Sequence, residues 1–442
     1  MPALRAVELI ERKRAGKELT KEEIEELVSG YVRGEIPDYQ VSAWLMAVCL
    51  RGLSQRETVD LTWAMAASGA MLDLAGVGWP VADKHSSGGV GDKTTLVVGP
   101  LVRACGVAVA KMSGRGLGFT GGTVDKLESI PGYVADLSAA QFVRQLEREG
   151  IVLAGQSPEL VPADRKLYAL RDVTGTVESI PLIASSIMCK KLAVGAQAVV
   201  LDVKVGSGAF MAELGEAREL ARLMVDIGTA ANRRVSALLT PMDQPLGMAV
   251  GNALEVAEAI ATLRGDGPRD LVELCVLLAG EMLYLAGAAG SPQEGRERAQ
   301  KALDSGDALQ VMERLLLAQG GDPRVLENPG IMGRAPHVLP VTSHSRGWVA
   351  GVDARGVARA ALSLGAGRAR KEDAVDHQVG VVLRVKAGSE VEEGTLLAEV
   401  HARDASVGER AAAEVLRAFR IEDVRPEVAP DSIERVGPVP AV

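Results

Sequence analysis

The stretch Asp83-Lys-His-Ser-Ser-Gly-Gly-Val-Gly-Asp-Lys-Thr-Thr95 gathers glycines, hydroxyls and lysines just before an apolar run from Leu96 to Val98. Glycines let backbone N–H groups turn towards an anion, hydroxyls donate to its oxygens, and an ammonium balances its charge. The stretch therefore predicts a phosphate-binding loop. It is not the Walker A loop of ATPases, because Asp92 stands where that motif needs a glycine before the lysine. The alternative is a glycine-rich turn whose lysines are incidental.

The β-rich run Val107 to Ala110 leads into a second glycine cluster, Lys111-Met-Ser-Gly-Arg-Gly-Leu-Gly-Phe-Thr-Gly-Gly-Thr-Val-Asp-Lys-Leu-Glu128. Gly116, Gly118 and Gly121 satisfy the G-x-G-x-x-G pattern, but this match alone is too common to indicate a dinucleotide site. Open α/β sheets place their ligands at the carboxyl ends of strands, and both clusters follow predicted strands. Hydroxyls and ammonium groups from the two clusters are therefore expected to converge on one phosphate.

The composition limits the partners and the compartment. The 442 residues are 47% hydrophobic, which suits two or three domains, and the formal net charge of −9 does not favour nucleic acid or an anionic membrane as a partner. The four cysteines are scattered without CxxC spacing, so we expect reduced thiols rather than a zinc site or disulfides. No segment resembles a signal peptide or a membrane span. We therefore expect a soluble, cytoplasmic protein.

Helical patterns dominate the first 70 residues. Thr20-Lys-Glu-Glu23 and Ser54-Gln-Arg-Glu57 are capping boxes followed by helical periodicity. Asp38 is placed to cap a further helix. The segment Tyr39 to Leu50 that follows it is apolar enough to be buried on several sides, which suits a subunit interface.

From Val81 onwards, short β-rich runs alternate with glycine clusters and amphipathic helices, a pattern typical of an α/β domain. The runs Thr94 to Val98, Val107 to Ala110 and Ala198 to Val203 predict buried strands joined through helices, hence a mixed, largely parallel sheet. Between Glu159 and Ala193 the composition is helical again, so we expect the chain to return to the first, all-helical domain.

The C-terminal part has a different character, because Val381 to Val385 and Thr395 to Val400 predict strands that flank Lys386 to Gly394. This resembles the hairpin of biotinyl and lipoyl carriers, but no lysine stands at the tip, so an α+β barrel-sandwich-like packing module is expected. The expected division is a helical domain (1–70 and 159–193), an α/β domain (71–158 and 194–335) and a C-terminal subdomain (336–442).

The second glycine cluster closely resembles the signature S-G-R-G-x-x-x-T-G-G-T-x-D-K-L-E of thymidine and pyrimidine-nucleoside phosphorylases. The resemblance covers nearly the full chain. Further matches are Asp83-Lys-His-Ser86, Tyr168-Ala-Leu-Arg-Asp-Val-Thr174, Ser179-Ile-Pro-Leu-Ile-Ala-Ser-Ser-Ile-Met188, Gln244-Pro-Leu-Gly247, Val250-Gly-Asn-Ala-Leu-Glu255 and Gly365-Ala-Gly-Arg-Ala-Arg-Lys-Glu-Asp373.

The resemblance implies a homodimer in which a cleft separates the helical domain from the α/β domain. No organic cofactor is implied, and inorganic phosphate is the co-substrate of a pyrimidine nucleoside. The residues implied to bind phosphate are Lys84, Ser86, Thr95, Lys111, Ser113 and Thr123. Those implied to grip the base are Arg171, Ser186 and Lys190, with His85 beside them as a further catalytic residue.

The implied reaction moves negative charge onto the departing base, which Arg171 and Lys190 would stabilise. A protonated His85 would donate to a carbonyl oxygen of that base. Ser186 and Lys190 are four residues apart and are expected to share one helix face. Asp164 either orients Arg171 or Lys190, or caps a helix that begins at Pro162.

Some relatives hold a monovalent cation, and Gly91, Leu246, Ala249 and Glu258 match the positions of its site. Lys93 stands where the site would supply a hydroxyl. We therefore expect the Lys93 ammonium to replace a potassium ion and to pair with Glu258, because two cations so close would repel each other. Phe119 is a second departure, since relatives commonly carry histidine there.

Three alternatives stay open from the sequence. One is a phosphorylase that accepts thymidine alone, since broad and narrow enzymes share these motifs. A second is a phosphoribosyltransferase of the anthranilate type, which uses similar glycine-rich phosphate loops with pyrophosphorylated ribose and Mg²⁺. The third is a nucleoside- or phosphate-binding protein without activity, against which the intact Lys84, His85 and Arg171 argue.

Overall fold

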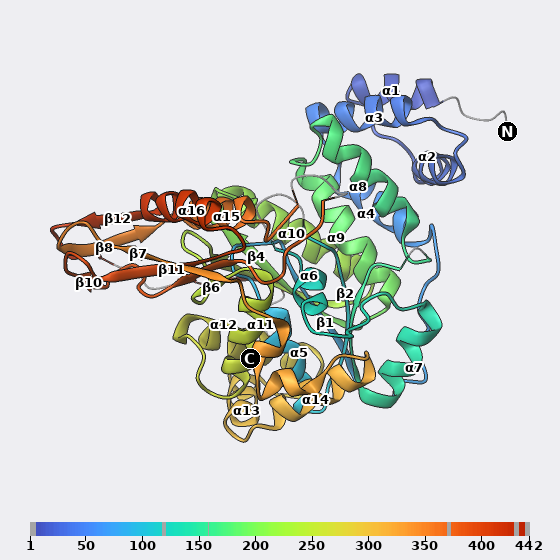
Figure 1. The fold of residues 1–442 in the computed structure, drawn as a ribbon. Coiled ribbons are helices and arrows are strands. Elements are labelled where there is room, and N and C mark those ends of the chain that lie inside the picture. The colour runs from blue at the N-terminus through green and yellow to red at the C-terminus, as the bar shows by residue number, and fades with distance from the viewer. Residues whose placement is uncertain (1–5, 117–120, 158, 369–372, 428–432, 438–442) are drawn as a thin grey trace.

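The computed structural model describes residues 6–116, 121–157, 159–368, 373–427 and 433–437. A six-stranded sheet of order β13-β5-β4-β1-β2-β3 lies at the centre, with β1 to β5 parallel and the short β13 antiparallel to β5 (Figure 1). Its strands are β1 (Val81–Ser86), β2 (Ala108–Ser113), β3 (Ile151–Gly155), β4 (Ala198–Val205), β5 (Arg234–Pro241) and β13 (Glu434–Val436).

The strand order determines where a ligand would bind. β2 and then β3 lie on one side of β1, and β4 and then β5 lie on the other side. The strand order therefore reverses between β1 and β4. In open parallel sheets, ligands bind outside the carboxyl ends of the strands at such a reversal. The loop after β1 and the carboxyl end of β4 lie at this point.

Both faces of the sheet are covered, because successive side chains of a strand point to opposite faces. Ala82, Val109 and Val200 belong to the hydrophobic core on one face, and Val81 and Ala108 to that on the other. Next to the sheet, the helices that contribute to the first core include α5 (Thr94–Ala104), α6 (Thr123–Glu128), α11 (Asn252–Leu263), α12 (Arg269–Leu285), α13 (Pro292–Asp304) and α14 (Asp307–Ala318), followed by the short turns η1 (Pro323–Leu326) and η2 (Pro329–Met332).

The helices of the second face include the N-terminal bundle. They are α1 (Ala6–Arg14), α2 (Lys21–Arg33), α3 (Asp38–Arg51), α4 (Gln55–Ala66), α7 (Ala139–Glu149), α8 (Pro162–Thr174) and α9 (Ile180–Val194), and α10 (Leu214–Ala230) covers β4 and β5 next to α9. Both predicted capping boxes are confirmed, since Thr20 and Ser54 each accept from the backbone N–H three residues on. α8 packs against α2, α3 and α4, and α9 against α4.

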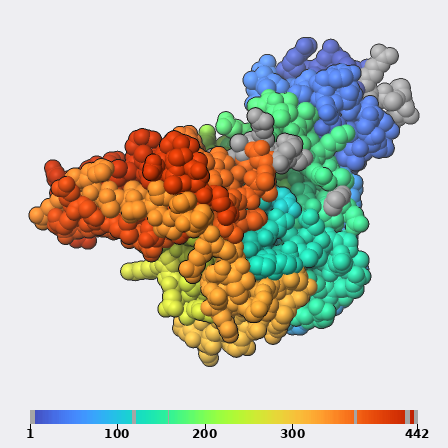
Figure 2. All heavy atoms as spheres, viewed as in Figure 1, coloured from blue at the N-terminus to red at the C-terminus, as the bar shows by residue number. Residues whose placement is uncertain are grey.

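The C-terminal residues, joined by the two-residue strand β6 from the middle of the chain, form two small antiparallel sheets with two helices. The C-terminal part projects as an arm from the body, away from the N-terminal helices (Figure 2). One sheet has the order β6-β9-β11-β7 and the other β10-β8-β12. The elements are β6 (Ala249–Val250), β7 (His337–Thr342), β8 (Gly347–Val352), α15 (Ala354–Ser363), β9 (Gly380–Leu383), β10 (Glu390–Val391), β11 (Leu396–Ala402), α16 (Ala405–Ala418) and β12 (Phe419–Glu422).

The fold class expected from the sequence is confirmed, and two local predictions are wrong. Thr94 to Val98 is the start of the buried helix α5, not a strand, because a short apolar run has the same appearance in a fully buried helix. Asp38 does not cap α3, since Pro37 occupies that position and the Asp38 carboxylate accepts from the Tyr31 hydroxyl at 3.0 Å. The division into domains at residues 70, 158, 193 and 335 stays a prediction.

All four cysteines are free thiols. No helix within the described residues combines the length and the apolar character needed to cross a bilayer.

Candidate active site

The first glycine loop joins β1 to α5 at the central strand of the sheet. Gly88 and Gly91 have φ values of 97° and 70°, which favour glycine and let the backbone turn sharply between Ser86 and α5. The Asp92 carboxylate accepts from the Ser86 hydroxyl and, at 2.6 Å, from the Thr94 hydroxyl. The loop is thus ordered by its own side chains, with its glycines at the amino end of α5.

The side chain of Lys84 extends from β1 on the face of the sheet that α5 covers, and it is almost fully buried. Its ammonium donates to the Thr94 hydroxyl at 2.5 Å and lies 3.1 Å from the Asp202 carboxylate and 4.0 Å from that of Asp92. Burial alone would lower the pKa of Lys84, but the two carboxylates outweigh it and raise the pKa above its usual value. Lys84 is therefore a fixed, fully charged ammonium at the reversal of strand order.

The second glycine cluster begins at the carboxyl end of the neighbouring strand β2, which carries Lys111 and Ser113. The Ser113 hydroxyl is buried and has no hydrogen-bond partner within the described residues, so it is available to a ligand. Burial and the nearby ammonium of Lys191 lower the pKa of Lys111 well below its usual value. An arriving anion would oppose both effects and favour the charged form of Lys111.

The two remaining residues of the predicted phosphate set stand at helix starts. Thr95 lies in the first turn of α5, and Thr123 is the first residue of α6. Five residues of the set thus lie on β1, on β2 or in the first turn of α5, and Thr123 begins α6, whose Lys126 ammonium donates to the Asp92 carbonyl of the first loop. Their roles as phosphate ligands stay predictions. Phe119 lies outside the described residues.

His85 lies between the two halves of the candidate site. Burial lowers its pKa well below the usual value, and the charges of Lys111 and Lys190 act in the same direction. These effects favour the uncharged imidazole in this conformation, whereas the sequence led us to expect a protonated one; the catalytic role of His85 stays a prediction. A neutral imidazole still donates one N–H, and Nδ1 has no hydrogen-bond partner within the described residues.

Arg171, near the end of α8, is held by the loop between α8 and α9 and by the first turn of α9. Its guanidinium donates to the carbonyl oxygens of Thr176 at 3.1 Å, Val177 at 2.7 Å and Leu182 at 3.0 Å. These bonds use three of the five N–H donors of the group. Burial lowers the pKa of Arg171, but a guanidinium keeps its charge at neutral pH.

Ser186 and Lys190 share one face of α9, as their spacing predicts, and both contact Asp164 of α8. The Ser186 hydroxyl donates to one carboxylate oxygen at 2.5 Å and the Lys190 ammonium to the other at 2.5 Å. Burial alone would lower the pKa of Lys190, but Asp164 outweighs it and raises the pKa. Of the roles considered for Asp164, orienting Lys190 is confirmed, and capping is wrong because Val161 is the N-cap of α8.

The expected cation position is filled by a side chain of the protein. The Lys93 ammonium donates to the carbonyl oxygens of Leu246 at 2.9 Å and Ala249 at 2.8 Å, and to Glu258 Oε2 at 2.5 Å. The Gly91 carbonyl accepts from the backbone N–H of Lys93 at 3.0 Å. The predicted pairing of Lys93 with Glu258 is confirmed.

Comparison with protein families and relatives identifies the chain. Family models match a glycosyl transferase helical bundle domain at residues 7–69, a glycosyl transferase a/b domain at 78–309, and a pyrimidine nucleoside phosphorylase C-terminal domain at 348–422. A pyrimidine-nucleoside phosphorylase of Geobacillus stearothermophilus is 52% identical over 398 residues, which is 90% of this chain and 92% of the relative. The chain belongs to the pyrimidine-nucleoside phosphorylase family. It is accordingly an enzyme of the pentosyltransferase class.

A second relative agrees with this family, and a solved structure outside the family shares the fold. A pyrimidine-nucleoside phosphorylase of Bacillus subtilis (strain 168) is 50% identical over 406 residues, covering 92% of this chain and 94% of the relative. The crystal structure of an anthranilate phosphoribosyltransferase from Thermus thermophilus superposes with a TM-score of 0.59 over 70% of this chain and 99% of that one, at 22% identity. That likeness shows the shared fold alone.

Three charged residues of this family member were missed by sequence reasoning. Asp202 and Lys204 lie on β4 beside Lys84, and Lys191 on α9 pairs with Asp83 at 2.7 Å, all with buried side chains. A signal was present, because Ala198-Val-Val-Leu-Asp-Val-Lys-Val205 places two charges at a spacing of two within an otherwise apolar strand. Charges so placed share one face of the strand and need buried partners.

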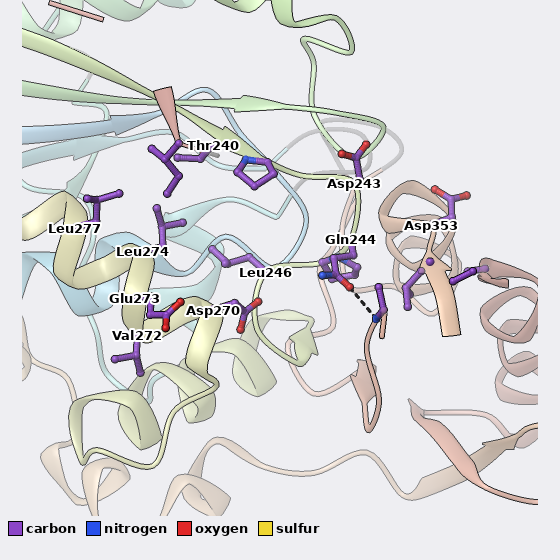
Figure 3. A pocket seen from close by; sticks show the side chains of 18 of the residues that line it. Thr240, Asp243, Gln244, Leu246, Asp270, Val272, Glu273, Leu274, Leu277 and Asp353 are labelled. Carbon is purple, nitrogen blue, oxygen red and sulfur yellow. Dashed lines mark hydrogen bonds between the residues drawn. The ribbon is translucent and has the colours of Figure 1, made fainter. Parts of the chain in front are cut away.

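A cavity of about 840 Å³ lies elsewhere, between α12 and the C-terminal arm. Figure 3 shows Asp270, Glu273 and Leu274 of α12 on one side and Asp353 on the other, with Gln244 bonded to the backbone of Ala387. None of the predicted phosphate or base residues lines this cavity. Leu246 of the expected cation position and Thr240, which donates to Asp202, do line it, so the cavity borders the candidate site without containing the predicted phosphate or base residues.

Proposed function

We propose that the enzyme catalyses the reversible phosphorolysis of pyrimidine nucleosides (uridine, thymidine and deoxyuridine) to free base and ribose or deoxyribose 1-phosphate. The observation that carries the proposal is the position of His85. Its pKa responds to Lys84 and Lys111 on the sheet side and to Lys190 on the helix side. The predicted phosphate lysines and the predicted base lysine therefore both lie near enough to one imidazole for their charges to affect it.

The chemistry follows from this arrangement. A phosphate oxygen attacks C1′ while the bond from C1′ to the base nitrogen breaks, and the bonding electrons leave with the base. Lys190 and Arg171 balance the resulting negative charge, and neutral His85 donates its N–H to a carbonyl oxygen of the base. The protein contributes position and charge without forming a covalent bond to the substrate, so the configuration at C1′ inverts.

Asp164 supports the base-binding side of this proposal. Its two oxygens fix the Ser186 hydroxyl and the Lys190 ammonium on one face of α9. A hydroxyl and an ammonium held side by side match the adjacent carbonyl oxygen and ring nitrogen of a pyrimidine. A flexible lysine would lose rotamer freedom on binding the base, and Asp164 removes part of that cost beforehand.

The co-substrate is inorganic phosphate, and no cofactor is proposed. The contacts of Lys93 support a reaction that does not need potassium, since its ammonium already contacts two carbonyl oxygens and the carboxylate of the expected cation site. A monovalent cation there would meet a resident positive charge.

We also propose that two copies of the chain associate through α3. Tyr39, Met46 and Leu50 lie on one stripe of this helix and are 74%, 39% and 75% exposed. Val173 on the adjacent α8 is 78% exposed. The sequence led us to expect Tyr39 to Leu50 to be buried on several sides at a subunit interface, and a second copy of the chain would cover this exposed stripe.

The test is phosphate-dependent release of uracil from uridine, with ribose 1-phosphate as the second product. An inactive binding protein would release no uracil, and an anthranilate-type transferase would instead consume phosphoribosyl pyrophosphate. Comparing the turnover of thymidine, deoxyuridine and uridine then determines the substrate range. Undetectable turnover of uridine with turnover of thymidine would make the enzyme a thymidine phosphorylase.

A further inference from the structure

We propose that Asp202 and Lys204 of β4 are positioning residues that orient Lys84 and leave its positive charge available to the phosphate substrate. The inference rests on the proposed function, because it takes Lys84 as a phosphate ligand. Neither residue needs to contact the substrate. They act through the ammonium of Lys84.

The sheet register brings these residues together. Ser86 of β1 pairs with Asp202 of β4, and Lys204 pairs with Thr240 of β5. Side chains two residues apart on a strand share a face, so Lys84, Asp202, Lys204 and Thr240 all point to the face covered by α5 and α12. The group spans the point where the strand order reverses, directly under the first glycine loop.

Asp202 connects the whole group. Its Oδ2 lies 3.1 Å from the Lys84 ammonium and 2.9 Å from the Lys204 ammonium, and its Oδ1 accepts from the Thr240 hydroxyl at 2.6 Å. The side chains of Asp202 and Lys204 are both 0% exposed. With no water to compete, these contacts fix the direction of the Lys84 side chain.

The charges explain why a second lysine is present. If Asp202 faced Lys84 alone, the buried pair would be neutral and Lys84 would attract an incoming phosphate weakly. Lys204 balances Asp202, so the three groups together carry one positive charge. The Lys204 ammonium makes no hydrogen bond within the described residues although it lies at ion-pair distance. Its contribution is therefore its charge.

Asp92 also acts on Lys84, from 4.0 Å, so without Lys204 the two carboxylates of Asp92 and Asp202 would outnumber the single ammonium of Lys84. The hydroxyls of Ser86 and Thr94 both donate to it. Lys126 lies nearby, and its ammonium donates to the Asp92 backbone carbonyl at 2.7 Å. Thr94 also accepts from Lys84 at 2.5 Å, which fixes the ammonium at the amino end of α5.

The experiment compares Lys204→Met with the double variant Lys204→Met/Asp202→Asn, varying phosphate at saturating uridine and then uridine at saturating phosphate. Lys204→Met leaves Asp202 unbalanced, and we expect it to raise the KM for phosphate at least about tenfold with a much smaller change in the KM for uridine. The double variant removes both charges, and we expect it to recover part of the affinity for phosphate. An unchanged KM for phosphate in folded Lys204→Met, or no recovery in the double variant, overturns the proposal.

Lys13→Met is the matched control, because Lys13 and Glu57 form an equally buried ion pair at 2.8 Å in the N-terminal helices. It should lower stability without a selective change in the KM for phosphate. Thr240→Val is the milder variant to use if Lys204→Met does not fold. It removes one hydrogen bond to Asp202, and a KM for phosphate raised a few-fold supports the proposal, whereas an unchanged value overturns it.

Protection against thermal unfolding by inorganic phosphate separates this inference from the proposed function. If the wild-type enzyme releases no base from any pyrimidine nucleoside, the proposed function fails. Phosphate should even then raise the Tm of the wild type more than that of Lys204→Met. Equal shifts in the two proteins overturn the role of Lys204 whatever the reaction is.

Discussion

The ammonium nitrogen of Lys93 lies 2.5 Å from Oε2 of Glu258, with the carbonyl oxygens of Leu246 and Ala249 at 2.9 and 2.8 Å. We predict that the wild-type turnover and Tm are the same in potassium chloride and in choline chloride of equal ionic strength. The reason is that the site is already filled by a tethered cation. A requirement for potassium in the wild type would contradict this.

Lys93→Thr should reverse that behaviour. The substitution removes the ammonium, leaves the carbonyl oxygens and the Glu258 carboxylate facing one another, and supplies a hydroxyl. We expect a lower Tm in choline chloride that potassium chloride partly restores, measured by thermal unfolding. Lys13→Met should lose stability to a similar degree and show no such recovery, since it leaves Glu57 without supplying a hydroxyl, and the Lys13 ammonium bonds to one backbone carbonyl, that of Gly52, where Lys93 bonds to two.

The neutral state of His85 predicts a pH dependence of stability. Its pKa is lowered in the folded state, so below the unfolded value of about 6.5 the unfolded chain binds a proton that the folded protein does not. Stability therefore falls as the pH decreases below about 6.5, by at most about 1.4 kcal/mol per pH unit from this group. We expect the Tm of the wild type to fall more than that of His85→Gln between pH 7.5 and 5.5. Parallel curves would show that the folded imidazole titrates normally.

Asp164→Asn tests how the base-binding residues are positioned. Losing the carboxylate charge weakens the hold on Lys190 and Ser186, so we expect kcat/KM for uridine to fall about tenfold to a hundredfold, with a small change in the KM for phosphate. Steady-state kinetics with each substrate varied in turn will measure this. Asp172→Asn is the control, because Asp172 is an exposed acid on the same helix and should leave the kinetics unchanged.

Leu50→Glu tests the association through α3. A charge in the middle of an apolar interface is costly, so we expect the variant to sediment as a monomer where the wild type sediments as a dimer. Leu317→Glu on α14 is the control, because Leu317 is also well exposed, at 59%, but lies outside the stripe. If both variants keep the mass of the wild type, the dimer uses another surface.

Much of the candidate site could be predicted from the sequence because its parts are local. The glycine loops determine their own turns, as the positive φ values of Gly88 and Gly91 show. The spacing of Ser186 and Lys190 predicts that they share one helix face, and in the structure both side chains donate to Asp164. The apolar run from Leu96 to Val98 was ambiguous. A buried strand and a buried helix such as α5 both consist of apolar residues, so the residue types alone do not distinguish the two.

The sequence by itself determined the fold class and the two anion loops, since each depends on residue type and short-range spacing. The replacement of a metal ion by the Lys93 ammonium was expected only from the resemblance to relatives that hold a cation at matching positions. Only the tertiary structure decided which charged side chains lie next to one another. Asp202 and Lys204 are far from Lys84 along the chain, and strand pairing places the Asp202 carboxylate beside both ammonium groups. The lowered pKa of His85 has the same origin, because burial and lysines from separate elements lower it together.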